Sequence, residues 1–234
     1  MTSPPVAPEA GSWTGASQPA PGAVVVVGAG SGLGAAVARR FGQDGRPVGL
    51  IGRRTAPLQA IAADLAAEGV RAVAAPADIR DPPALRSALA DLEQAVGPVE
   101  VLCFSPLPDT GLLRPVEVTT ADDVRAALEL NAVGAAAAVA AVLPGMLERG
   151  RGTLVFVTGG AAVRPSAERA VSAIAYAAES AYARMLHDAV AGAGVQVAQV
   201  TVLGAMGDGL QHSPDDVAAV IHDRAGEQFL TVVG

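Results

Sequence analysis

The sequence predicts a doubly wound α/β domain, in which a seven-stranded, mainly parallel sheet carries helices on both faces. Valine-rich apolar runs of strand length alternate along the chain with stretches of helical periodicity. The runs lack polar alternation, which is typical of strands buried on both faces, and the short links favour right-handed β-α-β units. The length of 234 residues suits one such domain. We therefore assign residues 23–234 to a single domain and the Pro-, Ala-, Ser- and Gly-rich residues 1–22 to a disordered tail.

Each element can be placed from the apolar pattern and from the residues that begin helices. The expected strands are residues 23–28, 48–51, 70–75, 99–104, 153–158, 195–202 and 229–233. The expected helices are residues 32–43, 57–68, 83–95, 120–148 and 170–191, and a last helix that opens at residues 213–215. Thr120 is expected to cap the long helix, with Asp123 placing an acid in its first turn. Ser213 followed by Pro214 and Asp215 is a similar start signal.

The composition excludes several classes of function. The net charge of −7 and the lack of a basic cluster argue against nucleic-acid binding. The apolar segment 133–143 is too short to span a bilayer, and residues 1–22 lack the features of a secretory signal, so no membrane association is expected. Cys103 is the only cysteine, which rules out an internal disulfide and favours a cytoplasmic location. All sixteen basic residues are arginine, so lysine chemistry is excluded, and no metal site is expected.

A glycine-rich loop follows the first strand and opens the first helix, with the sequence Gly28-Ala29-Gly30-Ser31-Gly32-Leu33-Gly34. Glycines at these places allow a tight turn and let the backbone approach a pyrophosphate closely. The helix that follows offers free N–H groups and the positive end of its dipole. The loop therefore predicts a dinucleotide site, and the alternative is a glycine-rich turn that binds no ligand.

The spacing Gly28-x-x-x-Gly32-x-Gly34 resembles the fingerprint of the short-chain dehydrogenase/reductase (SDR) family, with Val27 where that family usually has threonine. The resemblance extends over most of the chain after the tail and implies a Rossmann-like fold. It implies that the cofactor-binding residues of the loop are Gly28, Gly30, Ser31, Gly32, Leu33 and Gly34.

The residues after the second and third strands bear on the choice of cofactor. Gly52-Arg53-Arg54 holds no acid that would repel a 2′-phosphate, and Arg53 could bind one, so NADP(H) is expected over NAD(H). The alternative is that Arg53 is a solvated surface residue. Asp78, followed by Ile79, matches the family aspartate that contacts the adenine edge, and its alternative role is to cap a helix.

The resemblance weakens at the four residues that catalyse the reaction in this family, namely Asn, Ser, Tyr and Lys. Asn131 matches the first, although it could equally be a structural asparagine. Counting back from Gly194, which precedes the sixth strand, places Ser172 at the tyrosine position and Tyr176 at the lysine position. The serine position falls on Gly159. Because the chain has no lysine, no other alignment restores the Tyr-x-x-x-Lys motif, and we expect a divergent member without the Ser/Tyr/Lys residues.

A rearranged site is conceivable from the spacing of the remaining polar residues. Ser172 and Tyr176 are four apart and share one helix face. Tyr176 could donate the proton, with Ser172 or Thr158 holding the substrate and Arg169 supplying the missing cation. Tyr176 could instead pack in the emptied lysine position. Two histidines, His187 and His212, are weaker candidates.

Three functions remain open from these residues. The first is an NADP(H)-dependent oxidoreductase that acts on a small carbonyl or alcohol with a rearranged active site. The second is a catalytically inactive nucleotide-binding protein that serves as a sensor or structural subunit. The third is a non-redox enzyme, a cyclase or dehydratase, on the same scaffold. The short segment between residues 203–206 and Pro214 predicts that a substrate lid is nearly absent, and residues 105–114 and 161–169 match no motif that names a substrate.

The resemblance also implies a homo-oligomer, and the apolar long helix could form its interface. Residues 133–143 are Ala- and Val-rich on more than one face, which is more apolar than a solvent-exposed helix. We expect a homodimer or homotetramer in which this helix and the helix after the fifth strand pack across a two-fold axis. The alternative is simple burial against the sheet.

Overall fold

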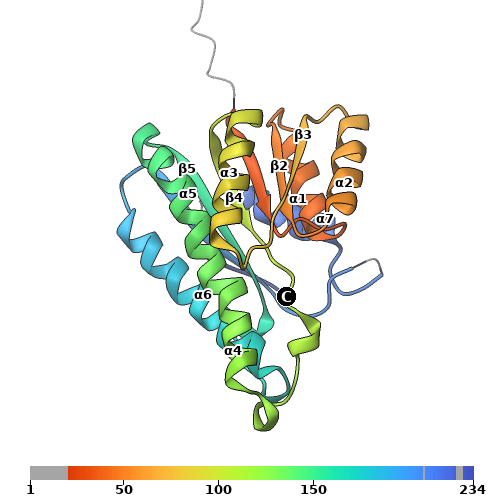
Figure 1. The fold of residues 1–234 in the computed structure, drawn as a ribbon, viewed down its shortest axis with the longest axis vertical. Helices are drawn as coiled ribbons and strands as arrows, with labels where there is room; N and C mark the ends of the chain where they lie inside the picture. The colour runs from red at the N-terminus through yellow and green to blue at the C-terminus, as the bar shows by residue number, and fades with distance from the viewer. Residues whose placement is uncertain (1–20, 208, 225–228) are drawn as a thin grey trace, which may run out of the picture.

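The computed structural model describes residues 21–207, 209–224 and 229–234, and these residues form one doubly wound α/β domain (Figure 1). Seven strands pair in the order β3-β2-β1-β4-β5-β6-β7, and every pairing is parallel. The strands are β1 Ala23–Val27, β2 Val48–Gly52, β3 Ala72–Pro76, β4 Val99–Phe104, β5 Gly152–Gly159, β6 Val195–Val202 and β7 Leu230–Val233. The predicted seven-stranded parallel sheet is confirmed.

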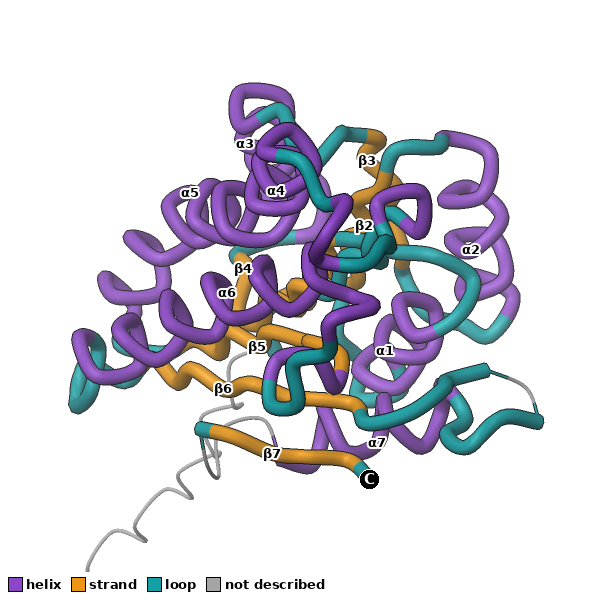
Figure 2. The backbone as a smooth tube through the Cα atoms, turned by 90° about the horizontal axis from the view of Figure 1, so that it is seen from below, coloured by secondary structure: helices purple, strands orange, loops and turns teal. Residues whose placement is uncertain are grey.

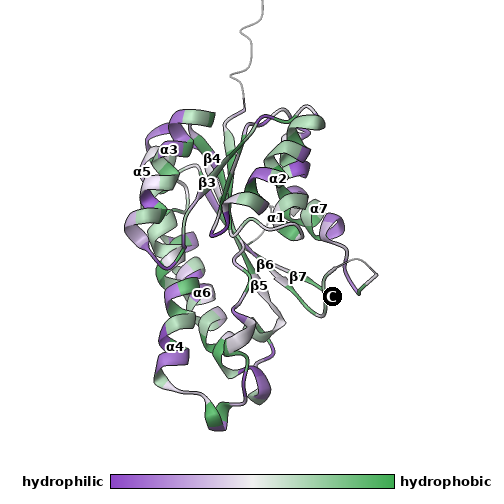
Figure 3. Cartoon of the chain, turned by 45° about the vertical axis from the view of Figure 1, so that its right-hand side comes forward, coloured by the Kyte–Doolittle hydropathy of each residue, from purple (hydrophilic) through white to green (hydrophobic). Residues whose placement is uncertain are grey.

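Helices cover both faces of this sheet (Figure 2). The helices are α1 Leu33–Gly42, α2 Thr55–Ala67, α3 Pro82–Val96, α4 Ala121–Leu128, α5 Gly134–Arg149, α6 Ala170–Ala189 and α7 Pro214–Arg224. One apolar core joins α1, α2 and α7 to one face of the sheet, and a second joins α3, α5 and α6 to the other. Figure 3 shows the strands as hydrophobic segments between these two helical layers. Buried valines on both faces explain why the strands show no polar alternation.

The helix starts follow the signals in the sequence. Thr120 and Asp123 form a reciprocal capping box at α4, with the Asp123 N–H donating to Thr120 Oγ1 at 3.2 Å. Ser213 Oγ accepts from the Asp216 N–H at 3.1 Å and so caps α7. Both predicted starts are confirmed.

The beginning of the domain lies slightly earlier than the sequence indicated. Residues 1–20 of the predicted tail lie outside the described residues. Gly22, which we assigned to that tail, donates its N–H to Glu100 Oε2 at 3.1 Å, beside the start of β4. The described domain therefore begins ahead of residue 23.

The predicted long helix is divided by a π-helical turn. The turn spans Glu129–Val133 and lies between α4 and α5, so that helical backbone continues from Ala121 to Arg149. This whole stretch is long and apolar enough, by length and composition alone, to cross a membrane, although its apolar segment 133–143 is too short by itself. A buried core helix meets the same criterion. Here α5 packs against α3, β4 and β5 and contributes Ala135, Ala138 and Met146 to the core.

Candidate functional site

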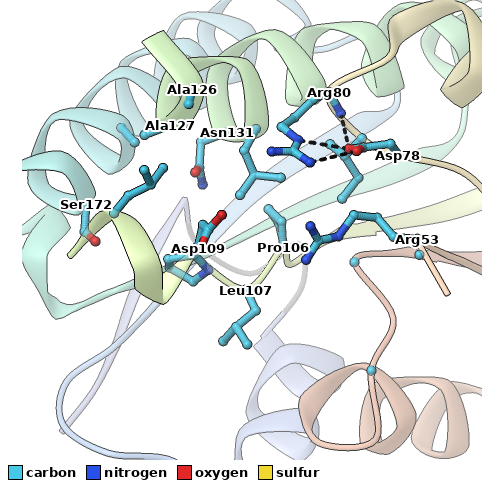
Figure 4. A pocket seen from close by; sticks show the side chains of 18 of the residues that line it. Arg53, Asp78, Arg80, Pro106, Leu107, Asp109, Ala126, Ala127, Asn131 and Ser172 are labelled. Atoms are coloured by element: carbon cyan, nitrogen blue, oxygen red, sulfur yellow. Dashed lines mark hydrogen bonds and ion pairs between the residues drawn. The ribbon is translucent and has the colours of Figure 1, made fainter. Parts of the chain in front are cut away.

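A pocket of about 220 Å³ opens at the carboxyl end of the sheet, beside β1 (Figure 4). Strand β1 lies between β2 and β4, and the connections from these strands run to helices on opposite faces. Such a switch point is where open α/β sheets bind ligands. The pocket is lined by residues 28–31 of the glycine loop, by the segments after β2, β3 and β4, and by the pocket-facing sides of α4, the π-turn and α6.

The glycines of the loop divide into two kinds by what a side chain would meet. Gly28 has a φ of +92°, and a β-carbon there would lie 2.7 Å from Cα of Pro106. A β-carbon on Gly34 would lie 2.8 Å from Cα of Ala29, so this glycine lets α1 pack closely on the loop. Gly30 and Gly32 would place a β-carbon in open space. Gly28 and Gly34 are therefore required by close backbone packing, whereas Gly30 and Gly32 leave open space next to the loop.

The start of α1 is suited to an anion. Gly32 occupies the N-cap position and has no side chain to cap the helix, and the first turn holds no acidic residue. Gly28, Gly30 and Ser31 line the pocket next to this helix end, whereas Leu33 is buried in the core. The start of α1 therefore lacks a side-chain cap, and its positive dipole end lies next to the pocket, although the predicted Gly32, Leu33 and Gly34 are not among the residues that line it.

The adenine side of the predicted site holds an arginine that sequence reasoning missed. Asp78 binds Arg80 through two contacts, Nη2 to Oδ2 at 2.9 Å and Nε to Oδ1 at 3.2 Å. The hydrogen bond from Arg80 is the main cause that holds the pKa of Asp78 below its usual value. Asp78, Ile79 and Arg80 all line the pocket. The alternative that Asp78 caps a helix is wrong, because Asp81 caps α3 by accepting from the Ala84 N–H at 3.1 Å.

Arg53 extends into the pocket from the end of β2 (Figure 4). Its side chain is exposed, and within the described ranges no hydrogen bond or ion pair occupies its guanidinium. Its charge also acts on Asp78, which therefore lies within the field of two guanidinium groups. The arrangement leaves the Arg53 guanidinium available to an anionic ligand.

Asn131 lies in the π-turn and lines the pocket, but it also has a buried partner. Its Nδ2 donates to Oε2 of Glu179 at 2.6 Å. Glu179 is fully buried, its Oε1 has no partner among the described residues, and burial raises its pKa to about 8. Sequence reasoning missed Glu179. The signal was a lone acid on the apolar face of α6, three residues after Tyr176.

Tyr176 and Ser172 lie together on the pocket side of α6, as their spacing predicted. The Tyr176 ring is 7% exposed and packs against Gly159, where a β-carbon would lie 3.2 Å from its Cε2 atom. Burial and the charge of Glu179 raise the pKa of Tyr176 above its usual value, and smaller effects of a hydrogen bond with the Gly159 backbone and of the Arg169 charge oppose this rise. A phenol in this environment is a weaker acid than a solvated tyrosine.

Comparison with known proteins assigns the chain to a family. A model of the short chain dehydrogenase family matches residues 22–212.

The chain belongs to the short-chain dehydrogenase family.

Its curated relatives are enzymes that it matches in part. It is 30% identical over 163 residues to 2,3-dihydro-2,3-dihydroxybenzoate dehydrogenase of Bacillus subtilis. This alignment covers 69% of the chain and 61% of the relative. It is 33% identical over 135 residues to an NADP-dependent 3-hydroxy acid dehydrogenase of Salmonella typhi. This alignment covers 56% of the chain and 52% of the relative. The chain thus spans about half to three fifths of the length of these two enzymes.

Solved structures of other proteins share the fold of this short-chain dehydrogenase. L-sorbose reductase from Gluconobacter frateurii, complexed with NADPH and L-sorbose, superposes with a TM-score of 0.83 at 19% identity, covering 91% of the chain and 95% of the reductase. A metagenomic short-chain oxidoreductase in complex with NADP superposes with a TM-score of 0.76 at 24% identity, covering 91% of the chain and 94% of the oxidoreductase. The Rossmann-like fold inferred from the glycine loop is therefore confirmed.

The other polar candidates of this short-chain dehydrogenase lie away from the pocket. Thr158 Oγ1 bonds to Thr201 Oγ1 at 2.9 Å, inside a buried network that also includes Gln199. His187 Nδ1 lies 3.1 Å from the Val197 carbonyl oxygen. His212 Nε2 lies 2.8 Å from the Leu203 carbonyl oxygen. Each side chain has a partner that gives it a structural role, and neither histidine lines the pocket.

Proposed function

We propose that this short-chain dehydrogenase binds NADP(H) in the pocket beside β1 and acts as an oxidoreductase on a small carbonyl or alcohol. The observation that carries the proposal is the open space at Gly30 and Gly32, next to the uncapped start of α1. A pyrophosphate needs close approach to backbone N–H groups, and these two glycines permit it. When bound, a nicotinamide cofactor supplies or accepts the hydride, and the chain positions and polarises the reactants.

The proposed preference for NADP(H) rests on Arg53 and Arg80. Arg53 is free to pair with a 2′-phosphate, and Arg80 is held beside the same part of the pocket by Asp78. The relatives named as NADP-dependent or solved with NADPH and NADP support the same preference. An acid that would repel the phosphate is absent from residues 52–54.

Replacing Arg53 with alanine should weaken NADPH binding by about 10- to 100-fold, because a charge-assisted hydrogen bond contributes about 1.5–3 kcal/mol. NADH has no 2′-phosphate, so its Kd should change less than about threefold. Titration calorimetry with both nucleotides measures the two changes, and Arg86→Ala, which removes an exposed arginine of α3 outside the pocket, is the matched control. Equal losses for NADPH and NADH would contradict the assignment of Arg53 to the phosphate.

The proposed catalytic arrangement departs from the family pattern. Ser172 and Asn131 are the polar side chains placed to contact a substrate oxygen, and Tyr176 fills the space that glycine leaves at position 159. The proton that carbonyl reduction requires then comes from solvent at the open pocket rather than from the buried phenol. This favours packing over proton donation as the role of Tyr176.

The test is NADPH oxidation with a panel of small aldehydes and ketones, using wild-type protein and Tyr176→Phe. If the ring only packs, the phenylalanine variant should retain turnover to within about threefold. Loss of an essential general acid would lower kcat by about 10²- to 10⁴-fold. The larger loss would restore Tyr176 as the proton donor.

The inactive nucleotide-binding protein remains the second candidate, because burial raises the pKa of Tyr176 and the chain contains no lysine. It predicts NADPH binding without oxidation by any member of the panel. Conversion of a substrate without any change at the nicotinamide would instead indicate a non-redox enzyme.

We also propose that two copies associate through α5 and α6, the two helices expected at a two-fold interface. Val133 and Leu147 on the long helix and Ile174 and Met185 on α6 are large apolar side chains that remain at least 41% exposed. Burying them against a second copy would remove this surface from water. Light scattering at micromolar concentration should give at least twice the mass of 23.2 kDa, and a monomeric mass would contradict the proposal. A cytoplasmic location stays a prediction.

A further inference from the structure

The pocket wall contains a buried acid-amide pair in which only one of the two carboxyl oxygens has a hydrogen-bond partner among the described residues. Asn131 reaches the pocket from the π-turn, and its amide nitrogen bonds Glu179 behind it at 2.6 Å. Glu179 comes from α6, so the pair joins two elements across 48 residues. Among the residues that the structure describes, its buried Oε1 atom has no hydrogen-bond partner, whereas each buried carboxylate oxygen ordinarily accepts hydrogen bonds. The pair therefore combines a pocket-facing amide with a carboxyl that has little else to stabilise its charge.

We propose that Glu179 is a positioning residue that decides which end of the Asn131 amide faces the pocket. An ionised carboxylate can only accept, so it holds the Asn131 NH₂ group and turns Oδ1 toward the pocket. A neutral carboxyl can donate its O–H to Oδ1, which lets the amide rotate and present NH₂ to the pocket. With Glu179 ionised, Asn131 thus accepts a hydrogen bond from a ligand hydroxyl. With Glu179 neutral, Asn131 donates a hydrogen bond to a ligand carbonyl.

The surroundings of Glu179 place this change near neutral pH. Burial is the largest cause that raises its pKa to about 8, and the hydrogen bond from Asn131 opposes that rise. Tyr176, one turn earlier on α6, is the titratable group that feels the charge of Glu179. Within the described part of the chain, no acid or base on α4, the π-turn, the neighbouring 3-10 turns, β5 or β6 shifts the Glu179 pKa. On β5 and β6, Thr158 and Gln199 are neutral and bond to each other, and Gln199 also bonds to Ser180, which follows Glu179.

The sequence offers an unusually clean test, because Asn131 is the only asparagine among the 234 residues. Asparagine labelled with nitrogen-15 in its side chain alone gives one nitrogen-15 amide resonance, and that resonance reports on this pair directly. Its chemical shift should follow a single titration with a midpoint near pH 8. Glu179→Gln should remove the titration and still fold, because glutamine has the same shape and no charge to bury.

The matched control is Glu129→Gln, which removes a half-buried carboxyl from the same π-turn and should leave the titration in place. Hydrogen exchange of the labelled NH₂ group tests the rotation itself. Relative to Glu179→Gln, wild-type protein should become at least about tenfold more protected above the midpoint, where the carboxylate holds the group.

Either of two results would overturn the inference. One is a wild-type signal that does not titrate between pH 5.5 and 10, and the other is a titration that persists in Glu179→Gln. The inference concerns the chain's own residues and holds whichever ligand occupies the pocket. Its failure would leave NADP(H) binding untouched, and a failure to bind nucleotide would leave the titration untouched.

Discussion

Replacing Gly30 with valine is expected to abolish NADPH binding without destabilising the protein. A β-carbon at Gly30 meets no atom of the described residues within 4 Å, and the backbone there does not adopt a positive φ, so we expect the folded chain to accommodate valine. Its methyl groups would fill the space that we assign to the pyrophosphate. We expect the Kd for NADPH to rise by more than about 100-fold, which corresponds to about 2.7 kcal/mol. Calorimetric titration measures the affinity, and thermal unfolding without ligand measures the stability.

Gly34→Ala is the contrasting variant for this prediction. Its β-carbon would lie 2.8 Å from Cα of Ala29, so this change should lower the unfolding temperature of the ligand-free protein. If Gly30→Val instead bound NADPH as tightly as wild-type protein, the glycine loop would not be the pyrophosphate site.

Replacing Glu179 with glutamine should change how stability depends on pH. The folded protein keeps a proton on Glu179 up to a pKa of about 8, whereas the unfolded chain loses it at the ordinary value of 4.5. Between these values the native state binds more protons than the unfolded state, so wild-type stability falls as pH rises. The slope is about 1.4 kcal/mol per pH unit from this group alone. The variant lacks this loss of stability. The free energy of unfolding of the variant should therefore exceed that of wild-type protein by an amount that grows to at most about 5 kcal/mol at pH 8.

Urea unfolding of both proteins at several pH values between 4.5 and 9 measures this difference. Glu93→Gln, which removes an exposed carboxyl from α3, should give a curve parallel to that of wild-type protein. Parallel curves for Glu179→Gln as well would mean that the buried carboxyl titrates normally.

The local features of this fold could be predicted from the sequence because their signals lie close together along the chain. The glycine loop, the Thr120–Asp123 capping box and the Ser213 start each depend on residues within one or two turns. The central strands could be placed because they are buried and strongly apolar, most clearly β1, whose valines are all fully buried. The family fingerprint then supplied the topology that periodicity alone does not provide.

The remaining parts of the site depend on contacts between distant elements. The bond between Asn131 and Glu179 joins the π-turn to α6, and no pattern in either segment indicates the other. The contact of the Tyr176 ring with Gly159 arises only when α6 packs on the end of β5. The π-turn itself is a change of hydrogen-bond register inside an apolar helix, which leaves the sequence periodicity almost unaltered.

Thermal unfolding with and without 1 mM NADPH tests most directly whether this short-chain dehydrogenase has kept its nucleotide site. A ligand at about 100 times its Kd stabilises the folded state by about 2.7 kcal/mol, which for a domain of this size raises the unfolding temperature by about 5–10 °C. We predict a rise of this size with NADPH and NADP⁺ and a smaller one with NADH and NAD⁺. No rise with any of the four nucleotides would contradict the proposed function.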